Sequence, residues 1–509
     1  MDHPSFNVKM LDPIKAKEFA VGLIKNNYRT GESSSREYLV KRTVIMEAPQ
    51  NIHPEILSAI RLLSEDRNVN MDTAVSIIED TVYNCDLSIY PDFSTGLAGI
   101  GYGIQYLICT GLIEEDADEV LEECDRHLFS AVYFRMHTDL THATGLMGIA
   151  SYFLGRLEDP HASDNNLSTL TSKSVLLSIL DILLIRFGVE GYVSSEIREL
   201  PRISMAETHD VKKFIQDFLH YDICNELALK LQNRIEQNPV SPARRYNNSI
   251  DTDMSDVTIV MPIRVDSDDR IANLKTIIRL YSTLENIHFI IWEADNYQHL
   301  HIEENERISY SFCMDDNPVF HFTYYRNVMI KQAKTPIVIV WDVDVLVPEE
   351  QLCRAVDDVR NQQAVLSFPY DGICYSLPPD MSDNFRNTLD WEVLLSEEEK
   401  FPTMFGQLTV GGIFVVDRER YMRAGMENEY FLGWGPEDIE RLKRLTILDL
   451  PVSRVKGCIY HLYHPRKLNS GYADRSQNLS AKKELLRICR MGKSDLLEEI
   501  ADWSWGVKK

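Results

Sequence analysis

The sequence lacks the features of a membrane-bound, exported or disulfide-bonded protein. No apolar run approaches the length of a membrane span, and the first residues have no apolar core like that of a signal peptide. The nine cysteines include no Cys-x-x-Cys pair, which favours reduced thiols over a disulfide framework or a structural zinc site. We therefore expect a cytoplasmic protein without a membrane span.

Positive charge is also scarce. Lysine and arginine number 53 against 78 aspartates and glutamates, so the formal net charge is −25 at pH 7. Such a surface does not attract nucleic acid, although the composition is compatible with a local basic cleft. The 509 residues, 44% hydrophobic and 26% charged, are enough for two or three domains, each with a core.

Four regions of the chain differ in their pattern of apolar and polar residues. Residues 1–235 carry apolar residues at helical spacing and predict an all-α domain, and residues 236–255 are polar, interrupted by proline and typical of a linker. Residues 256–475 alternate strand and helix patterns, which predicts a mostly parallel α/β sheet with right-handed crossovers. Residues 476–509 predict a helical tail that packs on the α/β domain.

The helical region contains a short repeat. Gly96-Leu-Ala-Gly-Ile100 and Gly145-Leu-Met-Gly-Ile149 each open an apolar helix, where small residues permit close packing. The repeat resembles the inner-helix starts of the lanthionine synthetase cyclase-like α/α toroids. Those cyclases bind zinc through a Cys-His pair, which is missing here, so cyclase activity is not implied. A module that binds a partner or acceptor and a plain scaffold both remain open.

In the α/β region, the strongest chemical signal follows a buried strand. The run from Pro336 to Pro348 is rich in β-branched residues and carries Asp342 and Asp344. Ligands bind at the carboxyl edge of such sheets, and paired carboxylates there can hold a divalent metal against nucleotide phosphates. The alternative is a solvated acidic turn. The strand expected at Val319–Thr323 precedes this run.

Three further motifs follow. Gly411 and Gly412 fall inside a predicted strand, Gln407–Val416, and suggest close approach of a ligand or backbone. Gly433-Trp-Gly-Pro-Glu-Asp438 places two acids in the first turn of a helix, where negative charge is favoured for purely structural reasons as well. His461-x-x-His464 comes after the last predicted strand, and lone histidines of this kind are often core residues.

Taken in order with Pro262-Ile-Arg264, these motifs resemble the β-1,4-galactosyltransferase group and the related chondroitin-polymerase-type enzymes over about residues 256–470. Those are glycosyltransferases of the GT-A fold. The resemblance implies metal-dependent transfer of galactose, GalNAc, glucose or GlcNAc from a UDP-sugar to a hydroxyl of a glycan or peptide acceptor. The implied metal is Mn²⁺, or Mg²⁺ in its place.

The resemblance also implies donor and metal contacts. Asp344 and His464 would bind the metal, with His461 in the place of a further ligand. The nucleotide would contact Pro262, Ile263 and Arg264 in one loop, and Arg326, which opens the helix before the Asp-bearing strand, would also contact the donor. Asp342 would face the donor sugar or ribose, and Gly411 and Gly412 would lie beside the donor.

The remaining implied roles concern the acceptor. Asp438 would act as the base that deprotonates the acceptor hydroxyl, giving inversion, with Glu437 holding the acceptor or the loop. Trp434 would provide an apolar face against the sugars. Pro436 and Ile439 depart from the family pattern, so the acceptor stays open. The absence of a membrane anchor, which the animal members have, looks like a bacterial cytoplasmic enzyme.

Three alternatives remain. A retaining GT-A transferase would need no base at Asp438. An inactive transferase could serve as a scaffold that binds a peptide through the helical domain. A nucleotidyltransferase can also place paired acids at a sheet edge, although it has no need of the Gly433–Asp438 segment.

Overall fold

The computed structural model describes residues 52–65, 67–84, 91–135, 137–192, 202–237 and 252–506. By its internal contacts the chain divides into two compact units. Unit 1 comprises Met1–Leu180 and Arg202–Tyr221, and unit 2 comprises Asp181–Pro201 and Asp222–Lys509. Most of the expected linker lies outside the described residues, so the predicted domain boundaries stay a prediction.

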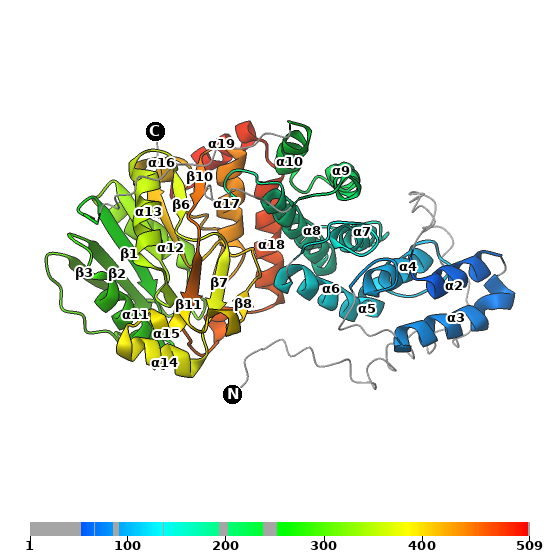
Figure 1. Ribbon diagram of the computed structural model, residues 1–509, viewed down its shortest axis with the longest axis horizontal. Helices are drawn as coiled ribbons and strands as arrows, with labels where there is room; N and C mark the ends of the chain where they lie inside the picture. Colours follow the sequence, from blue (N-terminus) through cyan, green and yellow to red (C-terminus); the bar gives the residue numbers. More distant parts are fainter. Residues whose placement is uncertain are drawn as a thin grey trace. The chain divides into compact units, whose positions relative to one another are not determined.

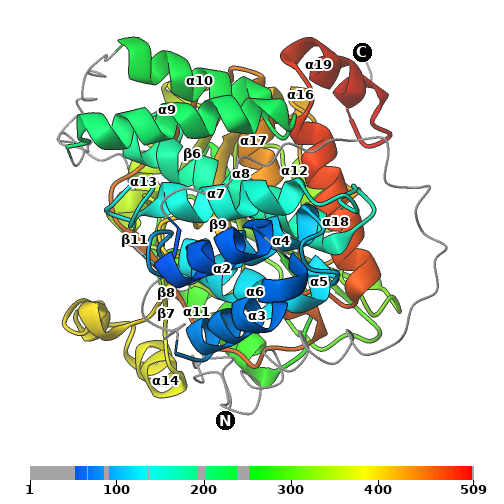
Figure 2. The ribbon, with the colours of Figure 1, turned by 90° about the vertical axis from the view of Figure 1, so that its right-hand side faces the viewer.

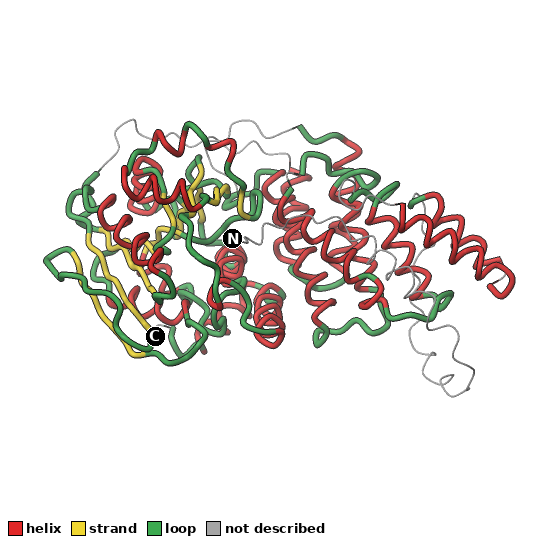
Figure 3. Tube along the Cα trace, turned by 90° about the horizontal axis from the view of Figure 1, so that it is seen from below, coloured by secondary structure: helices red, strands yellow, loops and turns green. Residues whose placement is uncertain are grey.

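The described part of unit 1 is built from helices (Figure 3). Helix α4 packs against α2, α6 and α7, and α7 also packs against α9 (Figure 2). A closed toroid is not shown, so the likeness to the cyclases stays a prediction. The helices that begin in this unit are α2 (Pro54–Glu65), α3 (Arg67–Asn84), α4 (Leu97–Cys109), α5 (Ala117–Val120), α6 (Glu122–Phe134), α7 (Leu146–Leu157), α8 (Leu167–Arg186) and α9 (Met205–His220).

The repeated glycine motif opens α4 and α7 in the same way. Each helix starts directly after the first glycine of its copy, and the second glycine lies against the preceding loop. A Cβ added at Gly99 would lie 1.8 Å from the Phe93 carbonyl oxygen, and one at Gly148 would lie 2.3 Å from that of His142. Only glycine fits either position, which is the close approach that the repeat predicts.

One described helix is long and apolar enough to cross a membrane. This helix, α8, has a mean hydropathy of 1.6 over its most apolar window, of which 78% is buried in the fold. The core helix of a soluble protein passes the same test. The expected absence of a membrane span is therefore still a prediction.

Unit 2 contains a seven-stranded sheet in the order β10-β6-β9-β4-β1-β2-β3 (Figure 1). Neighbouring strands are parallel, except that β9 runs antiparallel to both β4 and β6. The mostly parallel α/β sheet is thus as predicted. Its strands are β1 (Val257–Ile263), β2 (His288–Asp295), β3 (Ile308–Met314), β4 (Ile337–Trp341), β6 (Leu366–Phe368), β9 (Ile413–Asp417) and β10 (Val452–Arg454).

Helices cover this sheet. Helix α12 packs against β1 and β2, and α13 packs against β4, β6, β9 and β10. Every residue of β4 is buried, as expected for a β-branched strand in the middle of a covered sheet. The helices of unit 2 are α10 (Asn225–Gln237), α11 (Asp268–Tyr281), α12 (Phe322–Gln332), α13 (Glu349–Arg360), α14 (Pro379–Thr388), α15 (Glu392–Leu395), α16 (Arg418–Arg423), α17 (Glu437–Ile447), α18 (Arg475–Cys489) and α19 (Lys493–Asp502), with short 3-10 turns at Glu398–Lys400 and Leu468–Ser470.

A second, four-stranded sheet has the order β5-β11-β7-β8. Strand β11 (Cys458–His461) pairs antiparallel with β5 (Val345–Leu346), which directly follows the two aspartates. On its other side β11 pairs with β7 (Ile373–Ser376). Strands β7 and β8 (Thr403–Met404) are antiparallel, so they close the base of an arm, residues 377–402, that carries α14 and α15.

Two expected strands are corrected. The run Val319–Thr323 is not a strand, because α12 begins at Phe322 and Phe320 packs with Tyr325 and Ala294 in an apolar cluster. The strand beside β2 is instead β3. The pair Gly411 and Gly412 precedes β9 rather than lying within it, and Gly412 has a φ of +83°, which ends the extended conformation.

Candidate active site

Three side chains of the expected metal site lie together in unit 2. Donor atoms of Asp344, His461 and His464 are within 4.8 Å of one another. His464 Nε2 is 3.2 Å from Asp344 Oδ2, and His461 Nε2 is 3.7 Å from Asp344 Oδ1. The pairing of β11 with β5 brings the histidines to the aspartate, since His461 lies opposite Val345.

The hydrogen bonding of His464 fits a metal ligand. Its Nδ1 lies 3.1 Å from the carbonyl oxygen of Pro465, which can only accept, so Nδ1 carries a hydrogen and Nε2 is the ring nitrogen that faces Asp344. Burial lowers the pKa of His461 to about 3, so the His461 imidazole is neutral at pH 7. One carboxylate and two imidazole nitrogens suit a divalent transition metal.

Arg270, at the start of α11, is a neighbour of this cluster that the sequence analysis did not identify. Its Nη1 donates to Asp344 Oδ2 at 3.0 Å. Burial raises the pKa of Asp344, but the hydrogen bond to His464 and the charge of Arg270 act against burial, and the pKa lies well below its usual value. The carboxylate is therefore ionised at neutral pH.

A second acidic cluster, Glu293, Asp295 and His299, has different chemistry. Glu293 accepts hydrogen bonds from the backbone N–H groups of His299 at 2.7 Å and Leu300 at 3.2 Å. Asp295 Oδ2 accepts from the backbone N–H of Val265 at 3.0 Å. These carboxylates shape the loops after β1 and β2, and their oxygens already have protein donors.

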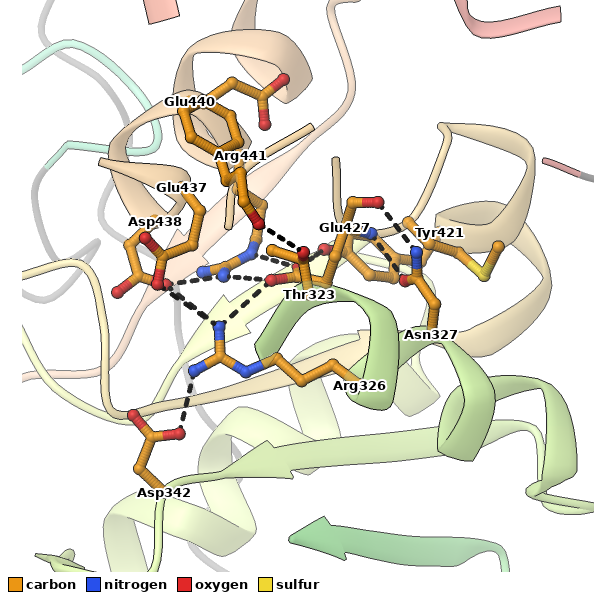
Figure 4. A network of polar contacts seen from close by, with 12 residues as sticks. Thr323, Arg326, Asn327, Asp342, Tyr421, Glu427, Glu437, Asp438, Glu440 and Arg441 are labelled. Atoms are coloured by element: carbon orange, nitrogen blue, oxygen red, sulfur yellow. Dashed lines mark hydrogen bonds and ion pairs between the residues drawn. The ribbon is translucent and has the colours of Figure 1, made fainter. Parts of the chain in front are cut away.

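Beside the metal cluster lies a network of two arginines and four carboxylates (Figure 4). At its centre Arg441 donates to both oxygens of Glu427, each at 2.7 Å, and Arg326 Nη1 lies 3.2 Å from Glu427 Oε2. Glu427 is 1% exposed. Burial alone raises its pKa, but the two guanidinium groups hold the pKa at about 2.

Arg326, predicted to contact the donor, connects the two halves of the site. Its Nη2 donates to Asp342 Oδ1 at 2.9 Å, next to the metal cluster. Its Nη1 lies 3.9 Å from Glu437 Oε1 and 3.7 Å from Asp438 Oδ1. One guanidinium thus touches the predicted donor side and the predicted base together.

Glu437 and Asp438 lie in the first turn of α17, as the sequence predicts. Arg441 Nη2 donates to Asp438 Oδ1 at 2.6 Å, whereas among the described residues Asp438 Oδ2 accepts no hydrogen bond. Glu437 Oε2 is buried, and no residue in the described part of the chain forms a hydrogen bond with it. Burial and the charge of Asp438 raise the pKa of Glu437 well above its ordinary value.

The glycine pair joins the two halves of the site through the backbone. A Cβ added at Gly411 would lie only 2.1 Å from Asp438 Oδ2, so the absence of a side chain makes room for this carboxylate. The carbonyl oxygen of Gly412 accepts from the backbone N–H of Asp342 at 2.8 Å. The short link from Asp342 to Gly412 and Gly411 therefore leads from the aspartate pair to the predicted base.

The other predicted residues lie around this centre. Pro262 and Ile263 end β1 and are buried. Arg264 joins the end of β2 to the loop after β3, because its Nε donates to the Ala294 carbonyl oxygen at 3.0 Å and its Nη2 to Asp315 Oδ2 at 2.7 Å. Trp434, in the loop before α17, packs edge-on against Tyr472 with ring centroids 5.0 Å apart.

Arg270, Glu427 and Arg441 belong to the site but were not predicted from the sequence motifs. Arg441 had a usable signal, since it follows Asp438 by three residues on the same helix and such pairs meet. Glu427 had none, because it meets Arg326 and Arg441 only once the chain has folded.

Comparison with known proteins gives one family match. Residues 395–467 match the model of the N-terminal domain of galactosyltransferase. This segment contains Gly411, Trp434, Asp438 and both histidines of the metal cluster. It covers much less than half of the chain. The match supports a glycosyltransferase. No curated protein sequence matches the chain.

Solved structures give weaker likenesses. One is the catalytic domain of Drosophila beta1,4galactosyltransferase 7 in complex with xylobiose, with a TM-score of 0.28 and 16% identity over 45% of this chain and 79% of that one. A mutant of that enzyme in complex with manganese, UDP-Gal and xylobiose has a TM-score of 0.28 and 15% identity over 44% and 78%. GalNAc-T7 with UDP, GalNAc and Mn²⁺ has a TM-score of 0.30 and 13% identity over 44% and 46%. At these TM-scores the likenesses assign no role to any residue.

Proposed function

We propose that unit 2 is a metal-dependent glycosyltransferase that moves a sugar from a UDP-sugar to an acceptor hydroxyl with inversion. The observation that carries this proposal is the arrangement of the Asp344, His461 and His464 cluster and the Asp438 carboxylate, connected through Asp342, Gly412 and Gly411. The galactosyltransferase match over residues 395–467 supports the same class. Galactose, GalNAc, glucose and GlcNAc remain open as the donor sugar, and the acceptor is a glycan or a peptide.

The donor would lie over the carboxyl ends of β1 and β4. Asp344, His461 and His464 would hold Mn²⁺, or Mg²⁺ in its place, and the bound ion would neutralise the leaving diphosphate. Pro262, Ile263 and Arg264 would contact the nucleotide. Asp342, fixed by Arg326 and two residues before Asp344 in the chain, would orient the donor sugar or ribose.

Asp438 would take the proton from the acceptor. Its Oδ1 is held by Arg441, which leaves Oδ2 to accept the hydroxyl proton while the acceptor oxygen attacks the anomeric carbon and UDP departs. Glu437 Oε2 has no hydrogen-bond partner among the described residues, and the raised pKa of Glu437 favours a protonated carboxyl that can donate to the acceptor. Trp434 would pack against the sugars.

A donor screen tests this proposal. Purified protein is mixed with each common UDP-sugar, with Mn²⁺ or EDTA, and release of UDP is followed. We expect metal-dependent release from one donor, abolished in Asp344→Ala and Asp438→Asn but kept in Asp316→Asn, which changes an exposed carboxylate outside the site. Wild-type rates in both site variants would refute the residue assignment.

Analysis of the transfer product, together with this screen, separates the alternatives. A product with the anomeric configuration of the donor would indicate a retaining transferase without a base at Asp438. Failure to bind or hydrolyse any UDP-sugar would favour the inactive-transferase scaffold, in which the helical unit binds a peptide.

A further inference from the structure

Helix α18 carries a buried lysine that has no role in the site described above. Lys482 is 8% exposed, and in the described part of the chain no hydrogen bond or ion pair joins its Nζ to another residue. Lys443, which is also buried, contacts Asp181 instead. Buried charges are normally paired, but no residue in the described part of the chain is a counter-ion for Lys482.

The ammonium of Lys482 ends beside an aromatic side chain. It lies 5.9 Å from the ring centroid of Tyr472, whose ring in turn packs edge-on against Trp434. Trp434, Tyr472 and Lys482 therefore form a continuous row from the loop before α17 to α18.

This row adjoins the predicted catalytic acids. Gln477, five residues before Lys482 on α18, donates from Nε2 to the Trp434 carbonyl oxygen at 3.2 Å. A Cβ placed on Gly435 would lie 3.6 Å from Ala481 Cβ, 3.9 Å from Tyr472 Cε1 and 3.8 Å from the unpartnered Glu437 Oε2. The aromatic pair and the first residues of α17 thus share one neighbourhood.

We propose that Lys482 binds an anionic group, a carboxylate or a phosphate, on the acceptor sugar. The inference rests on the proposed function, because it takes Glu437 and Asp438 to be the residues that meet the acceptor. The rings of Trp434 and Tyr472 would cover the sugar, and the ammonium would pair with its charge. On a chain with a net charge of −25, such an acceptor needs a local cation to bind.

Burial agrees with this assignment. It lowers the pKa of Lys482 to about 8, and no carboxylate of the described chain opposes that shift. An anion beside Nζ would favour the charged form and supply the missing partner.

The test compares matched acceptors in the UDP-release assay, with the preferred donor and metal. The pairs are an aryl glucoside with the aryl glucuronide, and glucose with glucose 6-phosphate. In wild type we expect kcat/KM for the anionic member to exceed that of its neutral twin by roughly tenfold or more, mainly through KM. The ratio should fall to about one in Lys482→Met and return in Lys482→Arg.

Lys483→Met is the matched control, because it removes the neighbouring charge on the same helix and should keep the preference. Lys482→Met removes an unpaired buried charge at similar volume, so we expect it to fold; near-UV circular dichroism checks this, and Lys482→Gln is the second neutral variant. The pair that shows the preference distinguishes a carboxylate from a phosphate.

The outcomes separate the two proposals. Absence of metal-dependent UDP release without acceptor would refute the transferase itself. With that release present, equal use of the neutral and anionic acceptors by wild type would refute the role of Lys482 alone. A preference that persists in Lys482→Met would refute it equally.

Discussion

Replacing Gly411 by alanine should disable the proposed base without unfolding the protein. The new Cβ would lie 2.1 Å from Asp438 Oδ2, and because real Cβ contacts are essentially never under 3.0 Å, the carboxylate must retreat by about 0.9 Å. A side-chain carboxylate can move that far, but only by straining its 2.6 Å hydrogen bond to Arg441. A misplacement of about 1 Å in a catalytic group can lower the rate about 100-fold.

The assay is metal-dependent UDP release at saturating donor, together with calorimetric binding of UDP and Mn²⁺. We expect kcat to fall on the order of 100-fold in Gly411→Ala while UDP affinity and the unfolding midpoint stay near wild type. Gly471→Ala is the control, since its Cβ would meet nothing within 4 Å. Wild-type turnover in a folded Gly411→Ala protein would refute the placement of Asp438 as the base.

The other predictions concern charge. Asp344→Ala should weaken Mn²⁺ activation by more than the roughly 10- to 100-fold typical of losing an outer-shell partner, as measured by metal titration. Glu427→Gln should lower the free energy of unfolding by about 3–5 kcal/mol in urea, because it breaks a buried ion-pair network. The raised pKa of Glu437 means that wild type is stabilised below pH 4.5 and loses this contribution as pH rises through the folded-state pKa. Glu437→Gln should not show that loss.

Each of these predictions can fail clearly. Unchanged metal activation in Asp344→Ala would remove the aspartate from the metal site. For Glu427, the comparison is Glu419→Gln, which breaks an exposed ion pair and should change the free energy of unfolding by at most about 1 kcal/mol. Equal losses in the two variants would show that the Glu427 network does not stabilise the fold. For Glu437, parallel pH profiles of wild type and the Gln variant would contradict the raised pKa.

The sequence predicted the strands of unit 2 best where burial on both faces leaves a continuous apolar run. β2 begins and ends where the pattern placed it, and β4 falls within the expected Asp-bearing run. The strand prediction failed at β3, because an edge strand with half-exposed residues has little apolar signal. It also failed around Phe320, where apolar residues that pack in a cluster have the pattern of a strand.

The residues of the candidate site were likewise predicted only in part. Asp344 and the two histidines were predicted as a group, and the structure brings them together. Arg270 and Glu427 were not, because ion pairs between distant segments depend on the fold and leave no spacing in the chain. The role of Gly411 was understood only in part: the sequence indicated a close approach, but not that the approaching group is the carboxylate of Asp438.

The antiparallel pairing of β7 with β8 has a practical consequence. Residues 377–402 leave and re-enter the small sheet at adjacent backbone positions, where the N–H of Ser376 donates to the Pro402 carbonyl oxygen at 2.9 Å. The pairing of β11 with β5 and β7 fixes the register of β11, and with it the position of His461. The arm also holds the segment between the two histidines. Ser382 Oγ accepts from the Tyr463 N–H at 2.8 Å, and Arg386 Nη2 donates to the Tyr463 carbonyl oxygen at 2.7 Å. A change of sequence at these two arm positions should therefore alter the spacing of the metal-binding side chains.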